Sequence, residues 1–221
     1  MTSSAIRSDL TGGRPAAPGP ALAELYAGNE RFVTGAQIHP NQGARHRAAV
    51  ATEQAPFAVI VGCSDSRLAA EIIFDQGLGD LFVVRTAGHT VGPEVLGSIE
   101  YAVTVLHAPL VVVLGHDSCG AVQAARTAVA TDVLPAGYLG AVVEAVIPSV
   151  QLAGAHGVDD PDRIVELHIE RTVDLLMERS APLGQAVSAG RCAVVGMSYQ
   201  LRAGRVREVA QGSVVPVVPA A

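Results

Sequence analysis

The stretch FAVIVGCSDSR at residues 57–67, together with LVVVLGHDSCG at residues 110–120, decides the fold. Each stretch begins with a continuous run of β-formers, which is typical of a strand covered on both faces. If the two runs are parallel strands, the segments that follow them emerge at the same edge of one sheet. The sequence therefore predicts that Cys63, His116 and Cys119 meet at one point.

Strand-like runs alternate with helical patterns along the rest of the chain, which predicts an α/β fold. We expect a mainly parallel four-stranded sheet flanked by helices, with an additional antiparallel edge strand. The two further parallel strands are predicted at residues 81–85 and 192–195, and the edge strand at residues 206–209. Helices are predicted over residues 21–33, 69–74, 93–106, 119–130, 137–150 and 162–179.

The N-terminal 20 residues, MTSSAIRSDLTGGRPAAPGP, are rich in Ser, Gly and Pro and predict a disordered tail before a single domain over residues 21–221. They lack the apolar segment of a signal peptide, so we expect a cytoplasmic protein. The helix at residues 21–33 has an apolar face but little core of its own. We expect it to form an N-terminal arm that packs on a neighbouring subunit.

The composition excludes several classes of protein. Hydrophobic residues make up 49% of the chain and charged residues 16%, which is ordinary for a packed α/β domain. The net charge is −6 and the 15 basic residues are scattered, so we expect no nucleic-acid partner. We also expect no membrane partner, because no apolar stretch approaches the roughly 20 residues that span a bilayer.

Two thiols and an imidazole are ligands that Zn²⁺ prefers. Three protein ligands leave one coordination position for water, which is typical of a catalytic rather than a structural zinc site. Taken singly, Cys63 and Cys119 would more often be buried apolar side chains than ligands, but their joint pattern with His116 favours ligands. We expect Cys192 to be a buried core residue. His89 follows the second strand and could approach the site. We expect the other histidines to be exposed or capping residues: His39, His46, His107, His156 and His168.

Asp65 and Arg67 follow Cys63 at intervals of two residues. Asp65 is close enough to accept a hydrogen bond from water at the metal, and Arg67 can hold that carboxylate off the metal by a bidentate pair. A cysteine-phosphatase loop does not fit, because Arg67 follows Cys63 after only three residues rather than five. A dinucleotide site is also disfavoured, because no Gly-x-Gly-x-x-Gly follows the first strand.

The motifs Cys-x-Asp-x-Arg and His-x-x-Cys, about fifty residues apart, resemble those of the β-class carbonic anhydrases, in particular actinobacterial members. The resemblance covers the chain from about Ala21 to beyond Tyr199. It implies one zinc per chain bound by Cys63, His116 and Cys119, and a catalytic dyad of Asp65 and Arg67. It also implies reversible hydration of CO₂ to bicarbonate and a proton by a homodimer or homotetramer.

The resemblance also suggests a subclass. In the subclass that bicarbonate regulates, a Trp stands three residues before the first Cys, where this chain has Ile60. Arg85 is nevertheless an element of the regulatory site in that subclass. The resemblance to the plant-like subclass implies a substrate pocket that comprises Gln54, Phe82, Tyr101 and the N–H of Gly120.

Two other functions are compatible with the same residues. The first is a related zinc hydrolase that acts on CS₂ or COS. The second is a non-catalytic zinc module in which Asp65 permanently fills the fourth coordination position.

Overall fold

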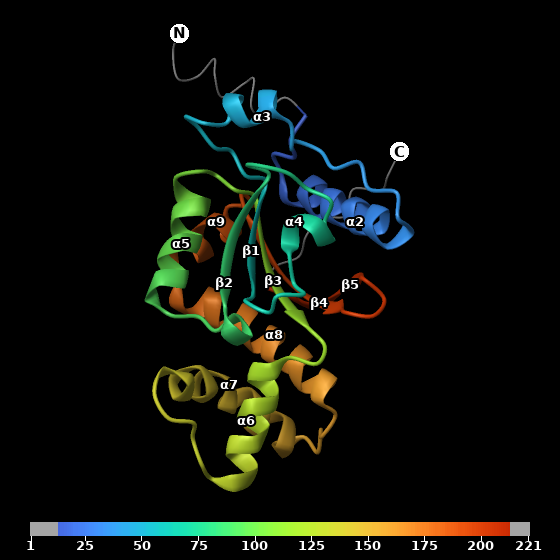
Figure 1. The fold of residues 1–221 in the computed structure, drawn as a ribbon. Coiled ribbons are helices and arrows are strands. Elements are labelled where there is room, and N and C mark those ends of the chain that lie inside the picture. The colour runs from blue at the N-terminus through green and yellow to red at the C-terminus, as the bar shows by residue number, and fades with distance from the viewer. Residues whose placement is uncertain (1–12, 213–221) are drawn as a thin grey trace.

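A five-stranded sheet forms the centre of the computed structural model, which describes residues 13–212. The strand order is β2-β1-β3-β4-β5 (Figure 1). The first four strands in this order are parallel, and β5 pairs antiparallel with β4. The predicted α/β fold is therefore confirmed, including its antiparallel edge strand. The strands are β1 (Ala58–Cys63), β2 (Leu81–Thr86), β3 (Leu110–His116), β4 (Ala193–Gln200) and β5 (Arg205–Gln211).

The helices lie close to the predicted ranges. Three further elements among the described residues fall outside those ranges: Ala44–Ala49, the 3₁₀ turn Ala87–His89 and Ala181–Ser188. The segment Ala181–Ser188 forms a helix that the sequence did not predict, because Pro182 and Gly184 fall within eight residues that carry no clear period. Its start is capped by the Ser180 hydroxyl, which accepts a hydrogen bond from the Leu183 N–H at 3.2 Å. The helices are α2 (Pro18–Thr34), α3 (Ala44–Ala49), α4 (Ala70–Ile73), the 3₁₀ turn η1 (Ala87–His89), α5 (Pro93–Thr104), α6 (Gly120–Thr131), α7 (Tyr138–Ala155), α8 (Pro161–Arg179) and α9 (Ala181–Ser188).

Helices cover both faces of the sheet. The helices α5, α8 and α9 pack on one face, and α2 and α4 lie on the other (Figure 1). Every residue of β1 and β3 is buried, as expected for strands covered on both sides. The helices α6 and α7 lie beyond the carboxyl ends of the strands, whereas α3 lies beyond their amino ends (Figure 1).

Helix α8 approaches the sheet closely because two glycines lie beneath one of its residues. A Cβ atom added to Gly115 on β3 would lie 2.6 Å from Ile169 Cδ1. A Cβ atom added to Gly196 on β4 would lie 2.6 Å from Ile169 Cγ2. The fully buried Ile169 side chain therefore occupies the space that side chains at both positions would otherwise fill.

The predicted tail overlaps the structure only in part, since residues 1–12 lie outside the described residues. Arg14 donates from Nη1 to the Ala55 carbonyl at 2.9 Å, and its Nη2 lies 3.0 Å from Oδ1 of the buried Asp80. Helix α2 begins at Pro18, three residues earlier than predicted. Residues 14–20 are thus tied to the domain rather than forming part of a tail.

The first helix has a docking site on its own chain, and its packing on a neighbouring subunit stays a prediction. Helix α2 packs on its own chain, against α4 and β5. A Cβ atom added to Gly28 would lie 1.8 Å from the Phe74 carbonyl oxygen, so only glycine permits this approach. The buried Asn29 joins three segments: its Nδ2 donates to the carbonyls of Ile73 and Gly204, and its Oδ1 accepts from the Val206 N–H.

Helix α7 is more apolar than expected, because no apolar stretch near the length of a membrane span was predicted from the sequence. Its 18 residues have a mean hydropathy of 1.4, so by length and composition alone it could cross a membrane. In the fold it packs against α6 and α8 and buries Val143, Val146 and Ala153. Only 33% of the helix is buried in this way, and Tyr138, Leu139 and Leu152 are exposed, so the packing accounts for only part of its apolar character.

We expect Asn29→Ala to lower the free energy of unfolding by about 3 kcal/mol, because it leaves buried backbone groups of three segments without their partner. Denaturant unfolding followed by circular dichroism measures this change. The matched control is Gln151→Ala, which alters an exposed position on α7 and should change stability by less than about 0.5 kcal/mol. Equal stability of the two variants would contradict the role given to Asn29.

Candidate metal centre

Three metal-ligating side chains meet where the central strands end. Cys63 is the last residue of β1, His116 is the last residue of β3, and Cys119 directly precedes α6. Their ligand atoms all lie within 4.8 Å of one another, and all three residues are buried. Among residues 13–212 they form the one cluster of at least three His, Cys, Asp or Glu that could hold a metal ion. The predicted meeting of these residues is confirmed.

The orientation of His116 suits a metal ligand. Its Nδ1 lies 2.8 Å from the Asp117 carbonyl oxygen, which can only accept, so Nδ1 carries the proton. In the neutral ring, Nε2 then has a free lone pair. This atom is fully buried and has no hydrogen-bond partner among the described residues. A bound metal satisfies such an atom, and the backbone carbonyl fixes the tautomer.

The two thiols differ in their ease of deprotonation. The Cys119 thiol, with His116 and backbone N–H groups beside it, lowers the pKa of Cys63 to about 4. The Cys63 thiolate in turn raises the pKa of Cys119, because two adjacent buried thiolates repel each other. A divalent cation removes that repulsion. The donor set therefore fits Zn²⁺, which binds thiolate and neutral imidazole.

Asp65 and Arg67 form the bidentate pair beside this cluster. Arg67 donates from Nε to Oδ1 at 2.9 Å and from Nη2 to Oδ2 at 2.8 Å, and its backbone N–H also reaches Oδ1. These contacts hold the pKa of Asp65 well below its usual range. Asp65 Oδ2 lies 3.8 Å from His116 Nε2, so the carboxylate stands next to the cluster while Arg67 holds both of its oxygens.

Arg85 supports the loop that carries these residues. It donates from Nε to the Cys63 carbonyl at 3.0 Å and from Nη2 to the Asp65 carbonyl at 2.6 Å. Arg85 lies at the end of β2, whose Thr86 is in register with Cys63. From the sequence, only the family resemblance marks Arg85, and it does not indicate these contacts.

The second loop, with His116 and Cys119, is held from two other elements. Ser118 has a left-handed backbone (φ 53°), and its N–H donates to Oδ1 of Asp162 in the first turn of α8. Asp117 Oδ1 accepts from the Leu201 N–H beyond β4. No sequence motif marks Asp162 or Leu201, because both lie far from the loop in sequence.

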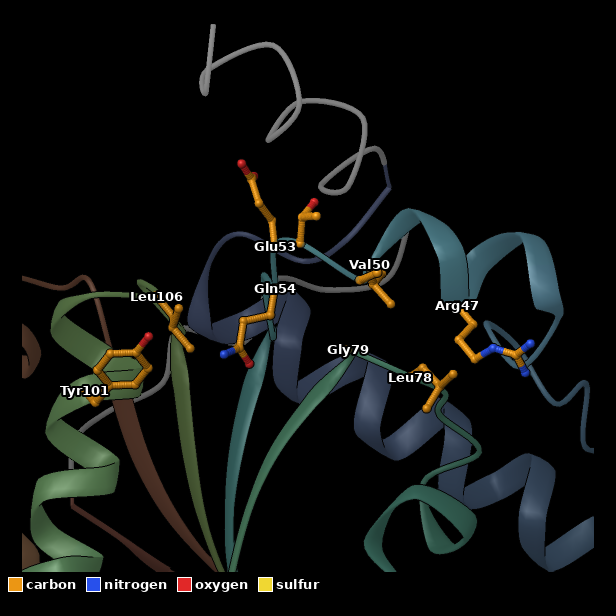
Figure 2. A pocket seen from close by; sticks show the side chains of 10 residues that line it. Arg47, Val50, Glu53, Gln54, Leu78, Gly79, Tyr101 and Leu106 are labelled. Atoms are coloured by element: carbon orange, nitrogen blue, oxygen red, sulfur yellow. The ribbon is translucent and has the colours of Figure 1, made fainter. Parts of the chain in front are cut away.

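The residues of the predicted substrate pocket are divided between the two ends of the sheet. Gly120 directly follows Cys119, whereas Gln54 and Tyr101 line a cavity of about 740 Å³ at the amino ends of the strands (Figure 2). The Phe82 and Tyr101 ring centroids are 6.3 Å apart, and Phe82 is in register with Val59, near the start of β1. Cys63 lies at the other end of β1, roughly 16 Å from Ala58 at the usual rise per residue. Within one chain, Gly120 adjoins the metal cluster, but Gln54, Phe82 and Tyr101 do not reach it.

Two histidines are buried, one of them against expectation. His168 is only 4% exposed, which corrects the expectation of an exposed or capping residue. His89 is fully buried, and its ring centroid lies 4.4 Å from that of His168. Cys192 is buried as expected, at the start of β4 and away from the cluster.

Comparison with known proteins places these features in one family. Residues 58–206 match the family model described as carbonic anhydrase. The chain is 56% identical to carbonic anhydrase 2 of Mycobacterium tuberculosis over 85% of its own length and 91% of that protein. It is 51% identical to carbonic anhydrase of Mycolicibacterium smegmatis, with 86% and 92% coverage. A tetrameric β-carbonic anhydrase of Sordaria macrospora superimposes with a TM-score of 0.66 at 26% identity, covering 73% of this chain and 84% of that one.

We expect about one zinc ion per chain in the purified protein. His116→Ala and Cys119→Ala should each lose most of that metal, because two remaining donors bind zinc weakly. Elemental analysis after dialysis measures the content, and Cys192→Ala, which changes the cysteine outside the cluster, should keep it. Full zinc content in either ligand variant would overturn the ligand assignment.

Proposed function

Because the chain belongs to the β-class carbonic anhydrases, we propose that it hydrates CO₂ reversibly to bicarbonate and a proton with a zinc ion held by Cys63, His116 and Cys119. The observation that carries this proposal is the buried cluster of three metal-ligating side chains beside a carboxylate that Arg67 holds. Three protein donors leave a coordination position for a small ligand.

The bound zinc would supply the Lewis acid that activates water for attack on the carbon of CO₂. The protein's part is to orient that water. Asp65 has a strongly lowered pKa, so its carboxylate stays ionised and only accepts hydrogen bonds. A water molecule beside Asp65 therefore points a hydrogen at the carboxylate and a lone pair towards the substrate. We propose Asp65 as the orienting residue and Arg67 as the residue that positions it.

The Arg67 contacts also separate this function from a non-catalytic zinc module. Such a module needs Asp65 on the metal, whereas the pair with Arg67 occupies both oxygens of that carboxylate.

The contacts of Arg85 support the unregulated, plant-like subclass. Its guanidinium is engaged by two backbone carbonyls of the loop, which leaves it less available to an added anion.

We propose that the substrate pocket is completed by a second copy of the chain. Gly120 begins α6, where the first N–H groups of a helix lack intrahelical acceptors, and can hold an oxygen of CO₂ or bicarbonate. Gln54, Phe82 and Tyr101 lie at the opposite end of the sheet in their own chain. Gln54 is exposed, and Tyr101 is 46% exposed.

Pairing of two chains along the edge strand β2 would bring the pocket residues of one chain next to the metal cluster of the other. The residues of β2 are mostly half-buried, and this strand pairs only with β1 among the described strands. If two copies meet along β2 around a two-fold axis perpendicular to that strand, the two β2 strands run antiparallel. The start of one β2, with Phe82, then lies next to the end of the other, where Thr86 is in register with Cys63. The tetrameric state of the Sordaria macrospora relatives supports a homo-oligomer, and we propose a cytoplasmic homodimer or homotetramer.

Mixing two inactive variants tests whether the pocket is shared. His116→Ala lacks the metal site and Phe82→Ala lacks a pocket residue, so each alone should have little CO₂ hydration activity. If the pocket acts across subunits, unfolding and refolding the mixture should restore about a quarter of the sites, one in each mixed dimer. Stopped-flow measurement of proton release follows the recovery. No recovery, although mixed dimers are present by mass spectrometry, would place the pocket within one chain.

Removing Arg67 tests the orienting pair. In Arg67→Ala the Asp65 carboxylate is free to reach the zinc, since carboxylate oxygen ligates zinc at roughly 2.0–2.2 Å. The rate of CO₂ hydration should fall by on the order of 100-fold while zinc stays bound. Arg205→Ala, which removes an exposed ion pair with Glu30, should keep the full rate. An unchanged rate in Arg67→Ala would refute this role of the pair.

A further inference from the structure

We propose that His168 on α8 is a positioning residue for the metal ligand Cys63, and that it acts through the backbone of Gly88. The proposal rests on the zinc site proposed above. It adds a residue that lies 105 positions from Cys63 in sequence and that no motif identifies. The link runs from His168 to the Gly88 carbonyl, and from the Gly88 N–H to the Cys63 sulfur.

Gly88 aims its N–H at the ligand sulfur. The N–H donates to Cys63 Sγ at 3.3 Å from within the 3₁₀ turn η1. Gly88 has a left-handed backbone (φ 63°), and an added Cβ atom would lie 2.7 Å from the Ala121 Cβ. Both the conformation and the space therefore require glycine at this position. The turn places a backbone donor on the metal ligand without any side chain.

His168 holds this turn from the opposite side. Its Nε2 lies 2.9 Å from the Gly88 carbonyl oxygen, which can only accept, so Nε2 donates. Its Nδ1 then accepts from the Ser149 hydroxyl at 2.9 Å. Burial lowers the pKa of His168 to about 4, which keeps the ring neutral and preserves this tautomer. Both ring nitrogens are thus used to fix the Gly88 carbonyl.

The neighbouring His89 shows why the turn needs such support. His89 also has a left-handed backbone (φ 43°), so two consecutive residues adopt a conformation that side chains disfavour. Its ring is buried beside the His168 ring and has no hydrogen-bond partner among the described residues. His89 therefore fills space but fixes no polar contact. The hydroxyls of Thr86 and Thr90 bond to backbone carbonyls at the ends of the turn, and His168 is the side chain that bonds to the carbonyl of Gly88 itself.

The hydrogen bond from the Gly88 N–H changes how strongly the Cys63 sulfur donates electrons to a bound metal. A hydrogen bond to a thiolate draws electron density from it, so the sulfur donates less to a bound metal, and such outer contacts tune metal sites. Two thiolates make the zinc a weaker Lewis acid than three neutral ligands would. A hydrogen bond from the Gly88 N–H to Cys63 partly offsets this loss of Lewis acidity. His168 determines the orientation of that N–H.

Cobalt substitution tests the proposal without relying on turnover, because Co²⁺ bound to thiolate has a sulfur-to-metal charge-transfer band that reports electron donation by sulfur. His168→Leu keeps the volume but cannot donate to Gly88. We expect stronger electron donation by the sulfur, seen as a charge-transfer band at lower energy, and metal affinity about 10- to 100-fold weaker in chelator competition because Cys63 is no longer held in place. His168→Gln, whose amide can donate from a similar place, should restore most of both. Cys192→Ala is the control, because it alters a buried side chain that lies outside the metal cluster and away from His168.

Ser149→Ala keeps the test decisive if His168→Leu does not fold. It removes only the hydroxyl that fixes the His168 tautomer, and it should shift the band in the same direction by a smaller amount. An unshifted band and unchanged affinity in His168→Leu, or in Ser149→Ala if only that variant folds, would overturn the proposal. An unmodified protein that binds Co²⁺ through thiolate but does not hydrate CO₂ would overturn the proposed function alone.

Discussion

The parallel pairing of β1 with β3 is the constraint on which the rest of the site depends. The two strands are in register from Val59 with Val111 to Gly62 with Leu114, so they end side by side. Parallel strands reach the same edge of a sheet, whereas antiparallel neighbours would place Cys63 and His116 at opposite edges. Because both strands are buried along their whole length, a shift of register would expose part of the core and is strongly disfavoured.

The strands bring the ligands together, but other elements determine the conformation of the loops. Arg85 at the end of β2 holds the carbonyls of the first loop. Asp162 at the start of α8 holds the second loop. In each case a side chain from outside the motif bonds to the backbone of the motif. The geometry of the cluster is therefore a property of the whole sheet edge.

Much of the fold and the metal cluster could be predicted from the sequence because the signals are local. Continuous runs of β-formers identify the buried strands, and ligand residues directly follow or end them. Other features depend on contacts between distant segments. The burial of His168 results from packing between α7 and α8, and the docking of α2 results from the space above Gly28. The end of the sheet at which Gln54 lies could not be predicted, because a family motif gives only its place in the sequence.

The glycines beneath Ile169 connect the sheet to α8 in a way that bears on how such a chain can evolve. Ile169 lies next to His168, so the depth at which Ile169 packs over Gly115 and Gly196 also sets how far the histidine reaches. A larger residue at either glycine would push the helix outward unless Ile169 became smaller in the same lineage. Positions 115, 169 and 196 are therefore expected to change together. Substitutions at these buried positions can therefore alter the chemistry at the sheet edge without a substitution of any residue at that edge.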